Sequence, residues 1–142
     1  MKILFEKINE NASVPVKAHE FDAGFDLRCV DSFEILPGHT HLVKLGFKTS
    51  MDQDVWVGIY SKSGLALNKE VFVLNAPGVI DSGYSGEWGV ILHNISQYKT
   101  VHFGKGDKVA QAIPHKITPC SFEIGVVSET KRGSGGFGST GR

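Results

Sequence analysis

Short runs of apolar and β-branched residues recur along the chain, and turn sequences rich in glycine, proline and aspartate separate them. Runs of this length and composition are typical of β-strands. We expect strands at residues 2–8, 25–30, 41–48, 55–60, 71–74, 87–93, 108–114 and 122–127. Helical periodicity survives for no more than about one turn, best at residues 64–68. The pattern predicts an all-β domain, built as a sandwich, barrel or jelly roll.

Length and charge narrow the class of protein. The 142 residues fit one domain, and 15 Lys plus Arg residues balance 15 Asp plus Glu residues. A balanced charge gives no global attraction to nucleic acid or to an anionic membrane, so we expect stable binding to neither. No run is apolar enough for a signal peptide or a membrane span, which predicts a cytoplasmic protein. Cys29 and Cys120 lack the spacing of a metal site, so we expect free thiols.

The composition changes after Glu129, where acidic residues end and glycine, serine and threonine dominate. We therefore predict a folded domain over residues 1–130 and a mobile lid over residues 131–142, because glycine loses the most entropy on ordering. Backbone N–H groups, hydroxyls and cations of this tail suit a phosphate, and Phe137 suits stacking on a base. The spacing resembles a Walker A loop, but the required lysine is missing. From composition alone, a terminus without function is the alternative.

Four stretches of the domain carry candidate chemistry. Asp26 follows Gly24 at the start of a strand, and Ser63-Gly64 could offer donors to a phosphate. Val79 and Ile80 indicate an apolar strand that ends at Asp81, a position suited to a general base. Alone, each of these stretches also fits an ordinary turn or helix cap.

Gln111 stands in an apolar run, where its amide needs a partner, either neighbouring backbone or a ligand. The histidines form no convincing metal set, since His39 and His41 are too few for zinc.

Taken in order, AGFDL, SKSGLAL, GVIDSGYSGEW, GDKVAQ and RGSGGFGSTG resemble the five motifs of the trimeric dUTPase family. The resemblance covers residue 23 to the end of the sequence. It implies a jelly-roll-like subunit, a homotrimer with active sites shared between subunits, and hydrolysis of dUTP to dUMP and pyrophosphate with Mg²⁺. Such an enzyme limits uracil incorporation into DNA and supplies dUMP for dTMP synthesis.

The resemblance also implies roles for single residues. Asp81 matches the general base for the attacking water, Gln111 a group that positions it, and Asp26 a carboxylate associated with Mg²⁺ through water. Tyr84 matches the ring beneath the deoxyribose that excludes a 2′-hydroxyl. The remaining matches are substrate-binding positions: Lys62, Ser63, Gly64, Asn75, Val79, Ile80, Trp88, Arg132, Phe137, Gly138, Ser139 and Thr140.

Three alternatives to parts of that interpretation stay open. The family usually has arginine where this chain has Lys62, and lysine cannot form the bidentate contact of a guanidinium group. A dCTP deaminase shares the fold, but its acid is absent from GVILHN at residues 89–94. A protein that uses nucleotide-dependent closure of the tail to bind a partner is the third alternative.

Overall fold

The computed structural model describes residues 1–137, and in that part of the chain antiparallel strands dominate. The strands are β1 (Ile3–Lys7), β2 (Phe25–Arg28), β3 (Phe33–Ile35), β4 (Thr40–Lys44), β5 (Phe47–Met51), β6 (Val55–Tyr60), β7 (Val71–Val73), β8 (Gly78–Asp81), β9 (Gly89–Asn94), β10 (Val101–Phe103) and β11 (Lys108–Lys116). A single short helix, α1 (Ser63–Lys69), joins β6 to β7 within the described residues. The all-β prediction is confirmed.

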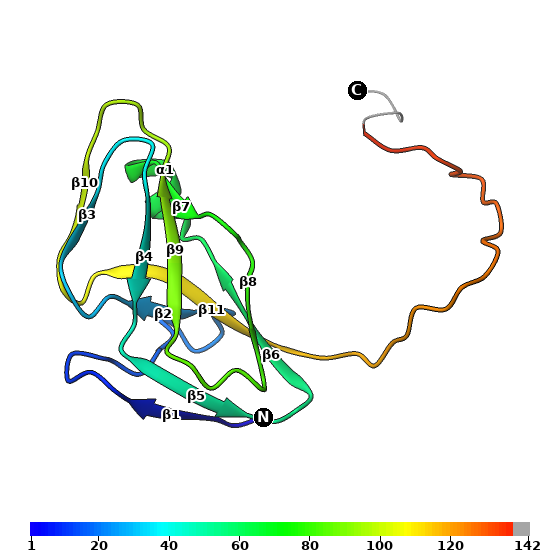
Figure 1. Cartoon of the computed structure of the whole chain (residues 1–142), viewed down its shortest axis with the longest axis horizontal. Helices are drawn as coiled ribbons and strands as arrows, with labels where there is room; N and C mark the ends of the chain where they lie inside the picture. The colour runs from blue at the N-terminus through cyan, green and yellow to red at the C-terminus, as the bar shows by residue number, and fades with distance from the viewer. Residues whose placement is uncertain (138–142) are drawn as a thin grey trace.

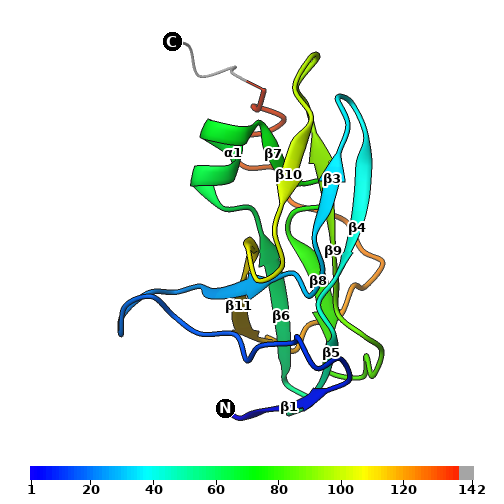
Figure 2. The ribbon, with the colours of Figure 1, turned by 90° about the vertical axis from the view of Figure 1, so that its left-hand side faces the viewer.

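The strands form a four-stranded sheet in the order β2-β11-β6-β8 and a three-stranded sheet in the order β4-β9-β7. Two-stranded ribbons β1-β5 and β3-β10 lie beside them, as Figures 1 and 2 show. Side chains alternate between partly buried and fully buried along β9, as expected of a strand with one face on a core. The core between the sheets includes Leu27, Val57, Leu92 and Val109, all of them buried.

The register of the four-stranded sheet decides which side chains share its outer face. Asp26 lies opposite Gln111, which lies opposite Tyr60. Trp56 lies opposite Asp81 at the other end of β6. Residues directly opposite in antiparallel strands project to the same side, and so do alternate residues of one strand. Asp26, Gln111 and Asp81 therefore lie on one face of one sheet.

The structure divides one predicted strand into two and adds strands that were not predicted. The run at residues 41–48 forms two strands, β4 and β5, because the chain turns at Gly46, whose φ is 72°. A Cβ there would lie 2.7 Å from Asn9 Cβ, so this turn also needs the close approach that glycine permits. Strands β3 and β10 were not predicted, because each has three residues and, unlike β7, neither is a continuous apolar run.

The predicted short helix is confirmed as α1, which ends where Glu70 adopts a left-handed conformation with φ of 55°. In the part of the chain that the structure describes, no helix is long and apolar enough to cross a membrane.

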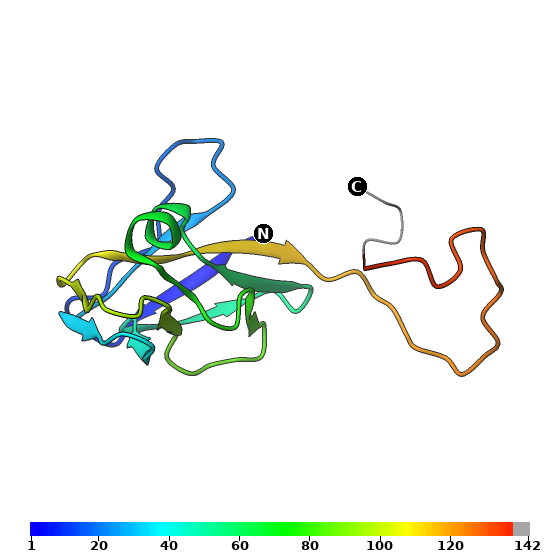
Figure 3. The same ribbon diagram turned by 90° about the horizontal axis from the view of Figure 1, so that it is seen from above.

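The strand predicted at residues 122–127 does not form, and this prediction is wrong for the single chain. After β11 the chain leaves the body as an extended arm, shown in orange and red in Figures 1 and 3. Its apolar side chains Phe122, Ile124 and Val126 are fully exposed, and residues 117–130 have no strand pairing. A strand needs a neighbour for its backbone hydrogen bonds, and the arm pairs with no strand in the part of the chain that the structure describes.

Candidate functional site

A cavity of about 270 Å³ opens between β8, β9 and the loop that joins them. Four of the predicted substrate-binding or site residues, Asn75, Val79, Ile80 and Tyr84, line it together. Asn75 lies in the turn before β8, and its side chain packs against Gly78, where a Cβ would lie 3.3 Å from Asn75 Nδ2. The cavity thus combines apolar walls with an amide and a phenol, the usual composition of a small-molecule site.

The loop between β8 and β9 holds Tyr84 in a fixed place at this cavity. The Tyr84 hydroxyl donates a hydrogen bond of 2.9 Å to the carbonyl oxygen of Glu87, and its backbone N–H donates to Asp81 O at 3.0 Å. A Cβ on Gly86 would lie 2.6 Å from the hydroxyl oxygen of Tyr84, so the ring packs directly over this glycine. The tyrosine side chain is 44% exposed and can therefore meet a ligand.

Glu87, at the end of the loop between β8 and β9, bonds to the β4–β5 turn. Its carboxylate accepts a hydrogen bond of 3.0 Å from the backbone N–H of Gly46 and lies 3.2 Å from Lys44 Nζ. Glu87 and Lys44 also line the cavity. Both were missed at the level of sequence, where the only signal was an acid that follows the Tyr84 turn.

Asp81 is the last residue of β8 and is exposed. It lies directly opposite Trp56 on the outer face of the four-stranded sheet. The Trp56 ring stacks on His115 with 4.4 Å between centroids, and the hydroxyl of Tyr60 lies 3.1 Å from His115 Nε2. The carboxylate is therefore placed beside a half-exposed aromatic surface, without an ion pair among the described residues.

A second cluster surrounds the carboxylate of Asp26. Asp26 is 8% exposed, and its oxygens bind two ammonium groups: Lys62 Nζ lies 2.5 Å from Oδ1, and Lys108 Nζ lies 2.6 Å from Oδ2. Burial by itself raises the pKa of Asp26, but the bonds from Lys108 and Lys62 outweigh it and leave the pKa below its ordinary value. Lys108 was missed in the sequence, although a basic residue three positions before Gln111 was visible.

Gln111 is held beside this cluster by two close contacts. Its Nε2 donates a hydrogen bond of 3.0 Å to the carbonyl oxygen of Ser61, just before Lys62. On its other side the backbone of Gly24 approaches so closely that a Cβ there would lie 2.4 Å from Gln111 Oε1. The first, second and fourth sequence stretches thus meet at one place.

Ser63 and Gly64 begin α1 immediately after Lys62. Both residues are exposed, and a Cβ on Gly64 would meet nothing within 4 Å. The surface beside Lys62 is therefore open, and it adjoins the cluster of Asp26, Lys62 and Lys108.

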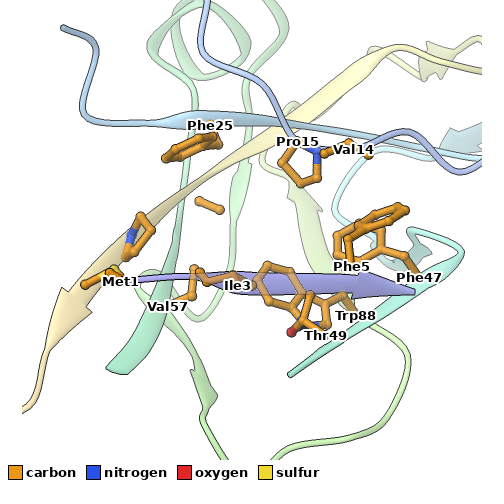
Figure 4. A pocket seen from close by; sticks show the side chains of 12 residues that line it. Met1, Ile3, Phe5, Val14, Pro15, Phe25, Phe47, Thr49, Val57 and Trp88 are labelled. Atoms are coloured by element: carbon orange, nitrogen blue, oxygen red, sulfur yellow. Dashed lines mark hydrogen bonds between the residues drawn. The ribbon is translucent and has the colours of Figure 1, made fainter. Parts of the chain in front are cut away.

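The prediction of Trp88 as a substrate contact is corrected. Trp88 is 3% exposed, packs on Phe47 at 5.1 Å between ring centroids, and donates its indole N–H to Thr49 Oγ1 at 3.0 Å. It lines a different, apolar cavity of about 310 Å³, shown in Figure 4, together with Phe5 and Phe25. Its only polar atom is satisfied, so its role is in packing.

The tail is not brought to either cluster in the single chain. Arg132 is exposed and donates from Nε to Gly135 O at 3.0 Å, and Phe137 is fully exposed at the end of the arm. Gly138, Ser139 and Thr140 lie outside the described residues. The division into residues 1–130 and a lid at residues 131–142 stays a prediction.

The described residues form no cluster of three or more histidine, cysteine, aspartate or glutamate side chains that could hold a metal ion. Asp26, the predicted metal-associated residue, already has an ammonium group on each oxygen. Direct ligation would place a cation among these ammonium groups, whereas a contact through water to a metal carried by phosphates is compatible with them.

Comparison with known proteins agrees with this geometry. Residues 10–141 match the model of the dUTPase family. The chain is 44% identical over 142 residues to the deoxyuridine 5′-triphosphate nucleotidohydrolase of Helicobacter pylori, with 99% of this chain and 97% of the relative covered. The corresponding protein of Clostridium novyi is 43% identical, with 99% of both chains covered.

The fold is also similar to that of the Staphylococcus bacteriophage 80alpha dUTPase solved with dUPNHPP. The TM-score is 0.89 with 23% identity, and 99% of both chains is covered. The chain belongs to the dUTPase family, and the jelly-roll-like prediction is confirmed.

Proposed function

We propose that this chain is a dUTP diphosphatase, which hydrolyses dUTP to dUMP and pyrophosphate. The observation that carries the proposal is the cavity shared by Asn75, Val79, Ile80 and Tyr84, with Asp81 at the end of the same strand. Family membership and the names of the curated relatives support it. The product dUMP would serve dTMP synthesis, and removal of dUTP would limit uracil in DNA.

In the proposed reaction, Asp81 accepts a proton from a water molecule, and the water oxygen attacks the α-phosphorus. The bond between that phosphorus and the oxygen bridging to the β-phosphorus breaks, so pyrophosphate leaves with the bonding electrons. Gln111, held by Ser61 and Gly24, would position the water or a phosphate oxygen. Positioning of this kind accounts for much of the rate in phosphoryl transfer.

Specificity for the nucleoside would come from the cavity. The Asn75 amide and the backbone of β8 and of the loop that follows it can pair with the edge of uracil, and a close fit disfavours cytosine and the methyl group of thymine. The ring of Tyr84 packs under the sugar, where it leaves no room for a 2′-hydroxyl. Its bond to Glu87 O keeps the ring in place.

A Mg²⁺ ion bound to the triphosphate would neutralise its charge and stabilise the leaving pyrophosphate. Asp26 would contribute to this ion through water, while Lys62 would bind a phosphate oxygen.

The proposed active site needs more than one copy of the chain. Gln111 and Asp81 lie on one face, but their partners on β6, Tyr60 and Trp56, are four residues apart, about 13 Å along the strand. The arm exposes a row of apolar side chains, which an assembled form would bury. Both observations favour an assembly of several copies, which we propose is a homotrimer. In it, Asp81 of one copy would lie near Gln111 and the tail residues of neighbouring copies.

The reaction is tested by pyrophosphate release from dUTP, dCTP, dTTP and UTP, with Mg²⁺ and with EDTA. We expect release from dUTP alone, and loss of it with EDTA. Ammonia release from dCTP would instead support the deaminase, and binding of dUTP without turnover would support the nucleotide-gated binding protein.

The shared site is tested by mixing two inactive variants, Asp81→Asn and Gln111→Ala, through unfolding and refolding. If the two residues come from different copies, about one site in four of an equal mixture has both wild-type side chains. Activity should then reappear on mixing. A mixture as inactive as its components would place both residues in one copy and refute the shared site.

A further inference from the structure

Lys108 reaches Asp26 because of an irregularity in strand pairing. On β11, Gln111 lies opposite Asp26 and Ala110 opposite Leu27, but the next pair is Lys108 with Arg28. One residue, Val109, is therefore inserted as a β-bulge, and it is buried in the core. Without the insertion Lys108 would lie opposite Cys29, whose side chain is buried. The bulge thus turns Lys108 onto the face of Asp26.

The two lysines that bind Asp26 are held differently. Lys62 belongs to the segment between β6 and α1 and precedes the open surface at Ser63 and Gly64. Lys108 is anchored by the bulge in β11, beside Arg28, whose guanidinium donates to Gly106 O at 2.7 Å. The backbone of Lys62 therefore borders the open start of α1, whereas the backbone of Lys108 is fixed by the sheet, although the Lys108 side chain is the more exposed of the two, at 40% against 26%.

The charge of this cluster suits an anion. One carboxylate and two ammonium groups leave one positive charge in excess, and Arg28 adds a second on the same face. A buried carboxylate that loses its only cationic partner is strongly unfavourable. With two partners, Asp26 can release one and keep the other.

We propose that Lys108 is a positioning residue for phosphate: it holds Asp26 through Oδ2, so that Lys62 can exchange its bond to Oδ1 for a bond to a phosphate oxygen of the nucleotide. The inference rests on the proposed function, since it assigns the triphosphate to this cluster. It also explains how a lysine serves where the family usually has arginine, because a point charge can move between two acceptors.

The test compares Lys108→Met with Lys105→Met. Lys105 lies on the turn just before β11, is exposed, and forms no ion pair with Asp26. Its variant therefore removes one positive charge close to Lys108 without changing the cluster. Binding of the non-hydrolysable analogue dUPNHPP, of inorganic triphosphate and of deoxyuridine is measured by calorimetry for both variants and the wild type.

We expect Lys108→Met to weaken the binding of dUPNHPP and inorganic triphosphate by about tenfold or more, since Lys62 is then retained by Asp26. Deoxyuridine, which has no phosphate, should bind equally to all proteins. Lys108→Arg should restore binding of the analogue, and KM should rise in Lys108→Met more than kcat falls. In nitrogen NMR, the ammonium signal of Lys62 should shift with dUPNHPP while that of Lys108 stays.

Equal affinities of Lys108→Met and Lys105→Met for the phosphate compounds would overturn the inference. A shift of the Lys108 signal in place of the Lys62 signal would also overturn it. If the wild type neither binds dUPNHPP nor hydrolyses dUTP, the proposed function fails, and the comparison with inorganic triphosphate still decides the role of Lys108.

Discussion

The backbone of Gly24 lies against the side-chain amide of Gln111, so that a Cβ on Gly24 would be 2.4 Å from Oε1. Gln111 lies opposite Asp26 in the pairing of β2 with β11, and Gly24 immediately precedes β2. The contact joins two motifs that are far apart in the sequence. A close approach of this kind makes the size of residue 24 a determinant of where the amide lies.

Replacement of Gly24 by alanine should therefore displace Gln111 and spare the fold. The closest atom, Oε1, is the far end of a flexible side chain and can rotate away, and the contact with Gln111 Cβ, at 3.2 Å, needs only a small shift, so we expect little cost in stability. We expect kcat/KM to fall about 100-fold, because misplacement of a positioning group by about 1 Å has this effect. Gly104→Ala is the matched control, since its Cβ would only touch Asp107 at 3.7 Å. A Gly24→Ala enzyme with wild-type kinetics would contradict a positioning role of Gln111.

Replacement of Asp81 by asparagine tests the proposed general base. The amide keeps the shape of the side chain at the end of β8 but cannot accept the proton. We expect kcat to fall about 10²–10⁴-fold, with binding of dUPNHPP unchanged. Turnover within a few-fold of wild type would reassign the base.

The features predicted from sequence were those set by local pattern. The strand at residues 55–60 and the helix after Lys62 follow from periodicity and turn residues near them in the chain, and both are present. The strand at residues 122–127 has the same local signal, yet it does not form, because strand pairing depends on a neighbour that the pattern does not encode. The apolar pattern of this segment is real, but the pattern does not say which strand, if any, the segment pairs with.

The site was predicted in part for a similar reason. Asn75, Val79, Ile80 and Tyr84 lie close together in the sequence, in β8, the turn before it and the loop after it, so their motif already places them together. Lys108 depends on a bulge that shifts it to the face of Asp26, which no spacing rule reveals. Trp88 is next to the β8–β9 loop in the sequence. Its side chain nevertheless points into the core, because it continues the alternation of buried side chains along β9.

The corrected role of Trp88 predicts a loss of stability without a loss of substrate affinity. Trp88→Phe removes the hydrogen bond to Thr49 and part of the packing on Phe47. We expect the free energy of unfolding to fall by about 1–3 kcal/mol, measured by urea denaturation. KM for dUTP should stay within about twofold of wild type. An unchanged stability together with a raised KM would return Trp88 to the substrate site.

Lys62→Arg should keep or improve activity, because a guanidinium group can bind Asp26 and can also form two bonds to a phosphate. The side chain is about one-quarter exposed, so the larger group has room at the edge of the cluster. Steady-state kinetics with dUTP check this expectation, and Lys62→Met is the control that removes the charge. A large loss with arginine would show that the cluster binds phosphate through a geometry that only an ammonium group allows.

The two cysteines should differ in reactivity and in their effect on stability at alkaline pH. Burial raises the pKa of the Cys29 thiol above its ordinary value of 9.0, and backbone hydrogen bonds near Asp107 and Gly106 offset this only in part. Cys120 is exposed on the arm. Since the native pKa of Cys29 is raised, its contribution to stability is present below pH 9.0 and is lost as the pH rises through the native pKa.

At pH 8 a thiol reagent should label Cys120 rapidly and Cys29 only in denaturant. Cys29→Ala should flatten the alkaline loss of stability in urea titrations, relative to Cys120→Ala. Rapid labelling of both thiols in the native protein would show that Cys29 is reached by solvent.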